Sequence, residues 1–426
     1  MTSKNKGVGP GVPSGSSNVS EVVTFSQSGG LVALLARLNV SLAFTSYQSG
    51  FFYLLGRGPN GAHLHQCAIP RPMGLARSGE RGIALTTGSQ LIRFENPLAS
   101  HERVNHQFDA CYVPRMVHVT GELDAHDVGL DGLERAIFVN TRFNCLARPD
   151  PVHSFREVWR PSFISALVDE DRCHLNGLAM RNGSPAFVTA CSRSDTIDGW
   201  RDRRANGGVV IDVERNAVIC EGLSMPHSPR WHNGQLWVLN SGTGELGVVE
   251  GFEEGMGTFV PKVFCPGFVR GLAFHDGHAV KGGYTFFEGY AFVGLSKPRY
   301  QRFEGLELDS RLEAADSEPW CGIQIIDLAR GVCVEWFRID GAVAELYDVE
   351  VLPGVACPMA ISPATPEAAG FVTWEGRTQP PSEPDPPPGT PDIAANGALI
   401  TDEQESAPRA LSDKKTGKGR KSPASM

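Results

Sequence analysis

The sequence predicts an all-β fold, a single six-bladed β-propeller whose ring is closed by strands from both ends of the chain. Three observations lead to this prediction. A strand-start motif recurs with a period of roughly 40–50 residues, which is typical of propellers and other repeat arrays. The clearest repeat contains four short strands separated by turns. An incomplete set of strands is left over near each end, and the two sets together make one blade.

The recurring motif begins with a polar residue at the start of an apolar strand. Its starts are His126, His174, His227 and Arg270, separated by 48, 53 and 43 residues. A further start, Tyr347-Asp348-Val349, follows after a longer gap. If these starts converge on one axis, three imidazoles face one another across a channel.

The segment 227–265 shows the strand pattern of one blade most clearly. Strands are predicted over 227–231, 235–240, 245–250 and 258–265. His232-Asn233-Gly234 has the composition of a tight hairpin turn. Four antiparallel strands in about 40 residues correspond to one propeller blade.

The same pattern predicts the remaining blades. Four other units cover residues 72–120, 126–166, 174–224 and 270–340. Insertions follow the second strand at 192–206 and 296–320, and a seventh blade would arise if 296–320 contained strands. Strands at 41–45, 51–55 and 64–69 lack a first strand, which 347–352 supplies. This closure over residues 24–355 removes an exposed sheet edge.

Composition bounds the class of protein and its partners. With 426 residues, 41% of them apolar, the chain can bury a large core, and its net charge of −9 argues against nucleic acid as a partner. No 18-residue apolar stretch predicts a membrane span. The ten scattered cysteines predict free thiols in a cytoplasmic protein. Residues 1–22 and the Pro-rich tail 380–426, with its basic end, are predicted to be disordered.

The mouth of the channel is the predicted functional site, because first strands line the channel and the loops after second strands open on the same face. A polar, convergent concavity on a rigid scaffold is where ligands usually bind. The predicted catalytic residues at the first strands are Asp127, Arg270, Tyr347 and Asp348. The predicted substrate-binding residues are Asn140, Arg142, Asn176, Asn240, Ser296 and Lys297.

The histidines at three successive blades predict a metal site. His126, His174 and His227 could hold a divalent ion such as zinc and leave one position open for water or substrate. Metal-bound water becomes acidic enough to serve as a nucleophile or base. Arg270 would hold a carboxylate or stabilise an oxyanion. In the alternative interpretation, each histidine only forms a structural hydrogen bond to a neighbouring blade.

The segment Asp198-Gly199-Trp200-Arg201 in the first insertion has two interpretations. It either stacks on or clamps a substrate, or it is a solvated loop with one anchoring tryptophan.

Three longer runs carry a resemblance to a known family: 173–179, 222–231 and 291–297. They resemble an uncharacterised bacterial family of conserved hypothetical proteins over about residues 24–355. In architecture the chain is similar to six-bladed propeller enzymes such as gluconolactonases, strictosidine synthases and the peptide-amidating lyase. The last of these uses a channel zinc held by histidines, which is an analogy of fold only.

Two functional hypotheses follow. In one, the protein is a metal-dependent lyase or hydrolase that acts on a small polar or peptidyl substrate at the channel mouth. In the other, it is a binding module that grips a ligand, peptide or protein partner without turnover.

Overall fold

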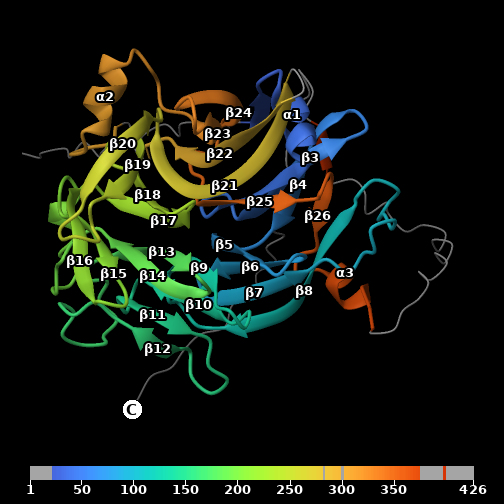
Figure 1. Ribbon diagram of the computed structural model, residues 1–426. Coiled ribbons are helices and arrows are strands. Elements are labelled where there is room, and N and C mark those ends of the chain that lie inside the picture. Colours follow the sequence, from blue (N-terminus) through green and yellow to red (C-terminus); the bar gives the residue numbers. More distant parts are fainter. Residues whose placement is uncertain (1–21, 282–283, 299–301, 375–396, 400–426) are drawn as a thin grey trace, which may run out of the picture.

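The computed structural model describes residues 22–281, 284–298, 302–374 and 397–399. These residues form the predicted six-bladed β-propeller, with six sheets of four or five strands arranged around a central axis (Figure 1). The predicted disordered segments 1–22 and 380–426 lie almost wholly outside the described residues. Within the tail, β27 (Gly397–Leu399) pairs with a strand of the first blade.

The ring closes as predicted. The first blade has β25 (Asp348–Pro353) innermost, followed outwards by β2 (Val40–Ser46), β3 (Phe51–Gly58) and β4 (Gly61–Ala68). Antiparallel pairing of Thr45 with Asp348 and of Val40 with Pro353 joins the two ends of the chain. The closure leaves the inner strand of this blade paired rather than exposed.

Five further blades follow in chain order. The second has β5 (Pro72–Ser78), β6 (Gly82–Thr87), β7 (Gln90–Glu95) and β8 (Ala110–Val119), extended by β26 (Pro358–Ala360). The third has β9 (Ala125–Leu130), β10 (Ala136–Asn140), β11 (Cys145–Arg148) and β12 (Arg156–Trp159). The fourth has β13 (Leu175–Arg181), β14 (Ser184–Ala190), β15 (Gly208–Asp212) and β16 (Ala217–Leu223). The fifth has β17 (Pro226–His232), β18 (Gln235–Asn240), β19 (Glu245–Glu250) and β20 (Thr258–Phe264).

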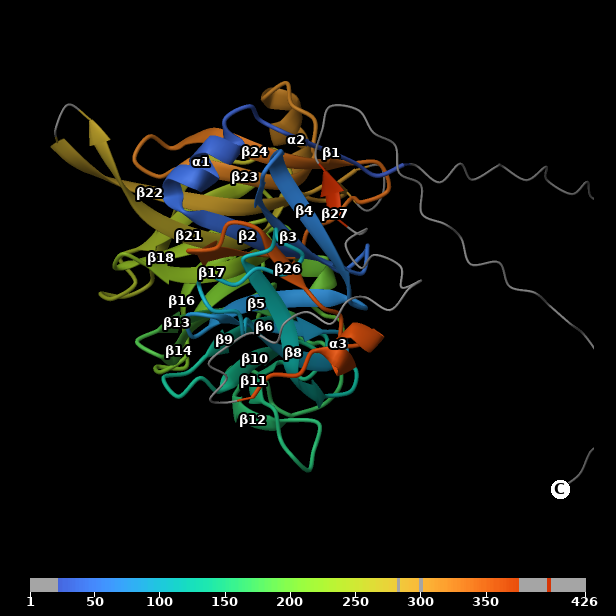
Figure 2. The same ribbon diagram turned by 90° about the vertical axis from the view of Figure 1, so that its right-hand side faces the viewer.

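The sixth blade differs from the others at its inner and outer edges. It contains β21 (Phe268–Lys281), β22 (Tyr284–Ser296), β23 (Cys321–Asp327) and β24 (Val332–Asp340), with β1 (Thr24–Gln27) outermost. The β21–β22 hairpin is longer than the others and extends beyond the ring (Figure 2). The 296–320 insertion contains α2 (Leu308–Ala314) and no strand among its described residues, so the blade count is six. Two other helices are α1 (Leu31–Leu38) and α3 (Pro366–Gly370).

The hydrophobic core lies between the blades. Successive side chains of a strand point to opposite faces. In β2, Leu42 and Phe44 therefore pack towards the sixth blade, whereas Ala43 packs towards the second. One apolar cluster fills each of the six blade interfaces in the same way. Burial on both faces explains why the strands read as short, nearly continuous apolar runs.

Hydroxyl groups fasten neighbouring blades together at the channel mouth. At the end of the second strand, Thr86 donates to the carbonyl of Ala125 at 2.7 Å, and Thr141 donates to the carbonyl of Leu175 at 2.6 Å. Ser241 makes the equivalent bond to the carbonyl of Val269. In each case the accepting carbonyl belongs to the next blade. It is the carbonyl of the residue that directly precedes a first-strand residue of the predicted site.

The thiol prediction is confirmed. All ten cysteines lie among the described residues and are free thiols, and nine of them are buried. Among the described helices, none has the length and apolar character needed to cross a bilayer.

Candidate active site at the channel mouth

In five of the six blades the pairing of the innermost strand is interrupted by a bulge, whereas β25 of the first blade pairs with β2 in regular register. The pairing of the first with the second strand shifts register in β5, β9, β13, β17 and β21. In β9 the shift falls around His126 and Asp127, and in β21 around Arg270 and Gly271. Bulges redirect side chains and are common beside active sites. Here they place one side chain per blade at the mouth and the next one below it.

The strand register shows that the three histidines are not equivalent, which corrects the sequence prediction. Leu175 pairs with Ala190 as Ala125 pairs with Asn140, so Asn176 is the counterpart of His126. Asn176 lies 50 residues after His126, within the repeat period. His174 lies two residues before Asn176, and its counterparts in the neighbouring blades are Asp124 and Met225. All three residues have a positive φ, which is 53° in His174.

His174 nevertheless joins the other side chains at the mouth. Its ring centroid lies 4.9 Å from that of His126, which lies 5.5 Å from that of Tyr347. The Arg270 Cζ atom lies 4.5 Å from the centroid of Tyr347, and Arg270 Nη2 donates to His227 Nε2 at 3.1 Å. All five side chains belong to residues that are at most 8% exposed. The predicted convergence on one site is therefore seen.

Hydrogen bonds at Nδ1 fix the orientation of all three imidazoles. His126 Nδ1 donates to the Asp124 carbonyl at 2.8 Å, and His227 Nδ1 donates to the Met225 carbonyl at 2.8 Å. A carbonyl can only accept, so Nδ1 carries the proton in both rings. In a neutral ring, Nε2 then has the lone pair, which in His227 faces Arg270.

The third imidazole has a different partner, a carboxylate that the sequence reasoning missed. His174 Nδ1 donates to Asp171 Oδ2 at 2.9 Å, and the Trp200 indole Nε1 donates to the same oxygen at 3.0 Å. Burial raises the pKa of Asp171, but the electrostatic interaction with His174 and the hydrogen bonds from His174 and Trp200 outweigh it, and the pKa lies below its usual value. A carboxylate behind an imidazole orients the ring and increases its strength as a base.

Burial holds two of the histidines in their neutral form. It lowers the pKa of His126 to about 4, with His174 and Arg270 adding to the effect and Asp124 opposing it. The pKa of His227 is also well below its usual value, because of burial and the neighbouring Arg270. Both rings are therefore neutral at neutral pH and can accept a proton or a hydrogen bond.

The first prediction is that acid destabilises the fold through these histidines. In the unfolded chain His126 titrates near 6.5 and in the folded chain near 4, so its stabilising contribution is present above pH 6.5 and is lost as the pH falls through 4. The loss amounts to about 3 kcal/mol. Urea unfolding between pH 7 and pH 4 should show it, and His126→Gln should flatten the curve. An unchanged pH dependence in that variant would contradict the assignment.

Arg270 is a buried cation without a carboxylate partner among the described residues. It is 8% exposed, and its only hydrogen bond in this part of the chain is to His227. Its Nε is buried with no hydrogen-bond partner there. Buried charges are normally paired, so an unpaired guanidinium at the mouth marks a place that suits an anion.

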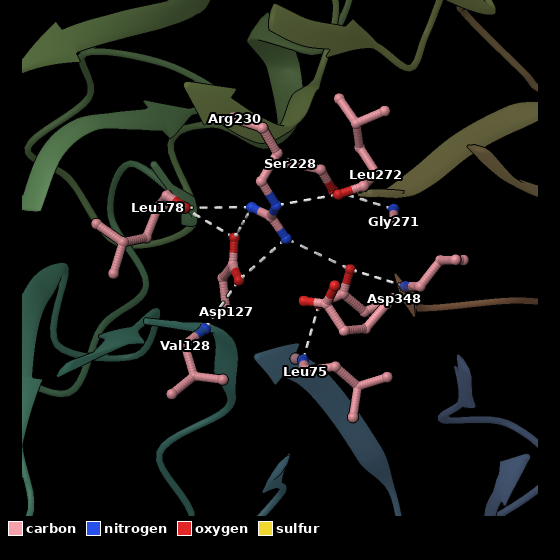
Figure 3. A network of polar contacts seen from close by, with 12 residues as sticks. Leu75, Asp127, Val128, Leu178, Ser228, Arg230, Gly271, Leu272 and Asp348 are labelled. Carbon is pink, nitrogen blue, oxygen red and sulfur yellow. Dashed lines mark hydrogen bonds and ion pairs between the residues drawn. The ribbon is translucent and has the colours of Figure 1, made fainter. Parts of the chain in front are cut away.

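A second group of charges is centred on Arg230 (Figure 3), and its carboxylates, Asp127 and Asp348, directly follow His126 and Tyr347 in the chain. Arg230 Nη1 lies 2.8 Å from Asp127 Oδ2, and Nη2 lies 3.5 Å from Asp348 Oδ1. The guanidinium also donates to the carbonyls of Leu178 and Leu272, at 3.1 Å each. The sequence analysis did not single out Arg230. Its place in a first strand that also carries a predicted metal ligand could have identified it as a site residue.

The two predicted catalytic carboxylates are thus engaged in holding the ring together. Asp127 Oδ2 accepts from the backbone N–H of Leu178 at 2.9 Å, and Asp348 Oδ2 accepts from that of Leu75 at 2.8 Å. Each bond joins one blade to the next. A catalytic role for either carboxylate stays a prediction.

The predicted substrate-binding side chains form hydrogen bonds or ion pairs with other residues of the protein. Asn140 and Asn240 accept from the backbone N–H groups of Phe143 and Ser224, Asn176 accepts from Thr189, and Ser296 donates to the Leu346 carbonyl. Arg142 pairs with Asp169 at 2.5 Å, and Lys297 lies 3.6 Å from Asp340. Their role in binding substrate stays a prediction.

The histidines as placed do not fit a three-histidine metal site. Across the residues that the structure describes, no group of three or more His, Cys, Asp or Glu side chains is positioned to hold a metal ion. His227 Nε2 already accepts from Arg270, and the guanidinium would repel a cation beside it. Zinc binding would require Arg270 to move away first.

Comparison with known proteins identifies a family. A family model described as "Domain of unknown function (DUF4915)" matches residues 29–361. No curated protein matches the chain as a relative.

The solved structures that match the chain are distant in sequence. A chain of the nidogen/laminin complex is 14% identical, with 74% of this chain and 99% of that chain covered and a TM-score of 0.42. Virginiamycin B lyase from Staphylococcus aureus is 10% identical over 74% of this chain and 99% of its own, with a TM-score of 0.34. A putative gluconolactonase is 13% identical over 64% and 89%, with a TM-score of 0.36.

Proposed function

The chain belongs to the family described as Domain of unknown function (DUF4915), and we propose that it is an enzyme whose active site is the channel mouth. The proposed chemistry is that of a lyase or hydrolase acting on a small polar or peptidyl substrate with a carboxylate group. The observation that carries the proposal is the unpaired, buried Arg270 beside neutral imidazoles.

Arg270 is proposed to bind the substrate carboxylate. A guanidinium presents planar donors that match a carboxylate, and in a water-excluded site the ion pair is strong. Tyr347 lies against the guanidinium and His227 accepts from it, so the group is held at one side of the mouth. The substrate would then extend towards His126 and His174 on the opposite blades.

His174 is proposed to be the general base. Asp171 holds its Nδ1 proton, which leaves Nε2 as the atom that accepts a proton. In an elimination, Nε2 would take a proton from carbon, the C–H electrons would form a double bond, and the leaving group would depart with its electrons. In a hydrolysis, Nε2 would take a proton from water as the water oxygen adds to a carbonyl carbon and the C=O π electrons move to the carbonyl oxygen. As these electrons re-form the C=O bond, the leaving group would depart with the electrons of its bond to carbon and would take the proton from Nε2.

Zinc at His126, His174 and His227 stays a separate prediction. It requires Arg270 to release His227, and no step of the proposed chemistry depends on it. Metal analysis of the purified protein tests it. A cytoplasmic location is likewise proposed, supported by the ten free thiols.

The proposal is tested with a mixture of small carboxylate-bearing lactones, esters, hydroxy acids and dipeptides, incubated with the purified protein and followed by mass spectrometry. We expect at least one compound to be consumed. Ligands that raise the melting temperature but are recovered unchanged would instead identify a binding module.

Arg270→Gln should then weaken binding of that compound by about 100-fold, since a buried ion pair is lost. The same variant should not lower the melting temperature, because Arg270 has no acidic partner among the described residues that would be left unpaired. Arg103→Gln is the matched control, because Arg103 is exposed and its side chain donates only to the carbonyls of Ser100 and Glu102 among the described residues. Equal binding by the Arg270 variant and wild type would refute the carboxylate assignment.

A further inference from the structure

Trp200 lies in the 192–206 insertion and contacts both members of the Asp171–His174 pair. Its ring centroid is 4.1 Å from that of His174, with an angle of 26° between the planes. We propose that Trp200 is a positioning residue for His174, which holds the carboxylate through its indole N–H and the imidazole through stacking. This inference rests on the proposed function, in which His174 is the general base.

The hydrogen bond from Trp200 determines which way the Asp171 carboxylate is turned. Asp171 Oδ2 accepts from His174 at 2.9 Å and from Trp200 at 3.0 Å, whereas Oδ1 is buried without a hydrogen-bond partner among the described residues. Without the indole N–H, only the bond to His174 would hold the carboxylate. The carboxylate could then rotate, and the imidazole that depends on it would lose its orientation.

Stacking is needed because His174 lies outside the regular sheet. It precedes β13 and has a φ of 53°, so no cross-strand neighbour packs against its ring as it would within a strand. The indole of Trp200 covers one face of the imidazole, and His126 meets the ring edge-to-face at an angle of 84°. The two contacts leave little freedom for the ring to turn.

The insertion is built to hold Trp200 in this place. Trp200 is 7% exposed, and the Arg201 Cζ atom lies 4.5 Å from its ring centroid. The Gly199 N–H donates to the Thr196 carbonyl at 2.9 Å, and a Cβ atom at Gly199 would lie 2.0 Å from Ser194 Oγ. A larger residue directly before Trp200 would have to displace the hydroxyl groups of Ser194 and Thr196, so glycine favours the turn that carries the indole. Of the two interpretations of this segment, an anchored tryptophan is what the contacts support.

The test is proton NMR of the full chain, which needs no substrate. A histidine Nδ1 proton bonded to a carboxylate gives a downfield signal that is protected from exchange with water. We expect this signal from His174 in the wild type and its loss in His174→Gln. Trp200→Phe, which keeps an aromatic ring but removes the N–H, should speed its exchange about tenfold. Trp200→Leu, which removes the stacking as well, should abolish it.

Trp237→Phe is the matched control, because the Trp237 Nε1 is buried without a hydrogen-bond partner among the described residues. It should leave the signal unchanged. An unchanged signal in Trp200→Phe and Trp200→Leu would overturn the positioning role, even if turnover requires His174. A signal that responds as expected in a protein that consumes no compound would support the positioning role and refute the proposed enzyme.

Discussion

Replacing Arg230 with methionine is expected to lower the free energy of unfolding by about 3 kcal/mol. Arg230 lies between Asp127 and Asp348, whose side chains are 5% and 4% exposed. Without the guanidinium, two buried carboxylates would face each other with no cation between them. Removing one partner of a buried ion pair costs about 3–5 kcal/mol, and the 21% exposure of Arg230 places the effect at the lower end. Urea unfolding at pH 7.5 measures it.

The pH dependence of this variant gives a second, independent measurement. Burial raises the pKa of Asp348 to about 8, against the opposing effect of Arg230. A carboxyl whose pKa is raised on folding stabilises the fold below its unfolded pKa, and this contribution is lost as the pH rises through the folded pKa. Without Arg230 the carboxyl should bind its proton more tightly still. In wild type this proton is released near pH 8, so the variant should lose less stability relative to wild type at pH 7 than at pH 9.

Two control variants separate loss of charge pairing from loss of packing. The first control combines Arg230→Met with both Asp127→Asn and Asp348→Asn. It should recover part of the stability, because no buried charge is then left unpaired. Arg103→Met, at an exposed side chain that donates only to the carbonyls of Ser100 and Glu102 among the described residues, should change the unfolding free energy by less than about 0.5 kcal/mol. If Arg230→Met unfolds like Arg103→Met, the charge network does not stabilise the ring.

His174→Gln should reduce turnover of any compound that the protein consumes by about 100- to 10,000-fold, the usual contribution of a general base. The amide can form hydrogen bonds but cannot take up a proton. Asp171→Asn should also reduce turnover, because an amide NH₂ facing His174 Nδ1 would favour the wrong tautomer. The fold should be retained, since the core lies between the blades and not at the mouth. Initial rates and far-ultraviolet circular dichroism measure the two effects.

His153→Gln serves as the control for this substitution, because His153 lies in an exposed loop. It should turn over substrate at the wild-type rate. Wild-type turnover by His174→Gln would exclude His174 as the base and would leave His126, which is neutral and lies 4.9 Å from it between ring centroids, as the next candidate.

The sequence by itself determined the order of the blades and the closure of the ring, and it predicted six blades, whereas the helix in 296–320 excluded a seventh. Apolar runs and turn residues are local signals, and each blade contains its own copy of them. The unpaired strands at 41–69 and 347–352 could be matched because a blade needs four strands, whatever their distance along the chain. The location of the candidate site followed from the same repeat, since first strands line the channel in any propeller.

Only the tertiary structure decided which side chains act together at the mouth. The bulges in β9, β13 and β17 shift the register without changing the repeat spacing, so the offset of His174 from His126 and His227 could not be seen in the sequence. Arg230 meets Asp127 and Asp348 across 103 and 118 residues, and Trp200 reaches Asp171 from an insertion. Hydrogen bonds of this kind depend on angles and distances that arise only when the blades pack around one axis, and no local pattern of residues encodes them.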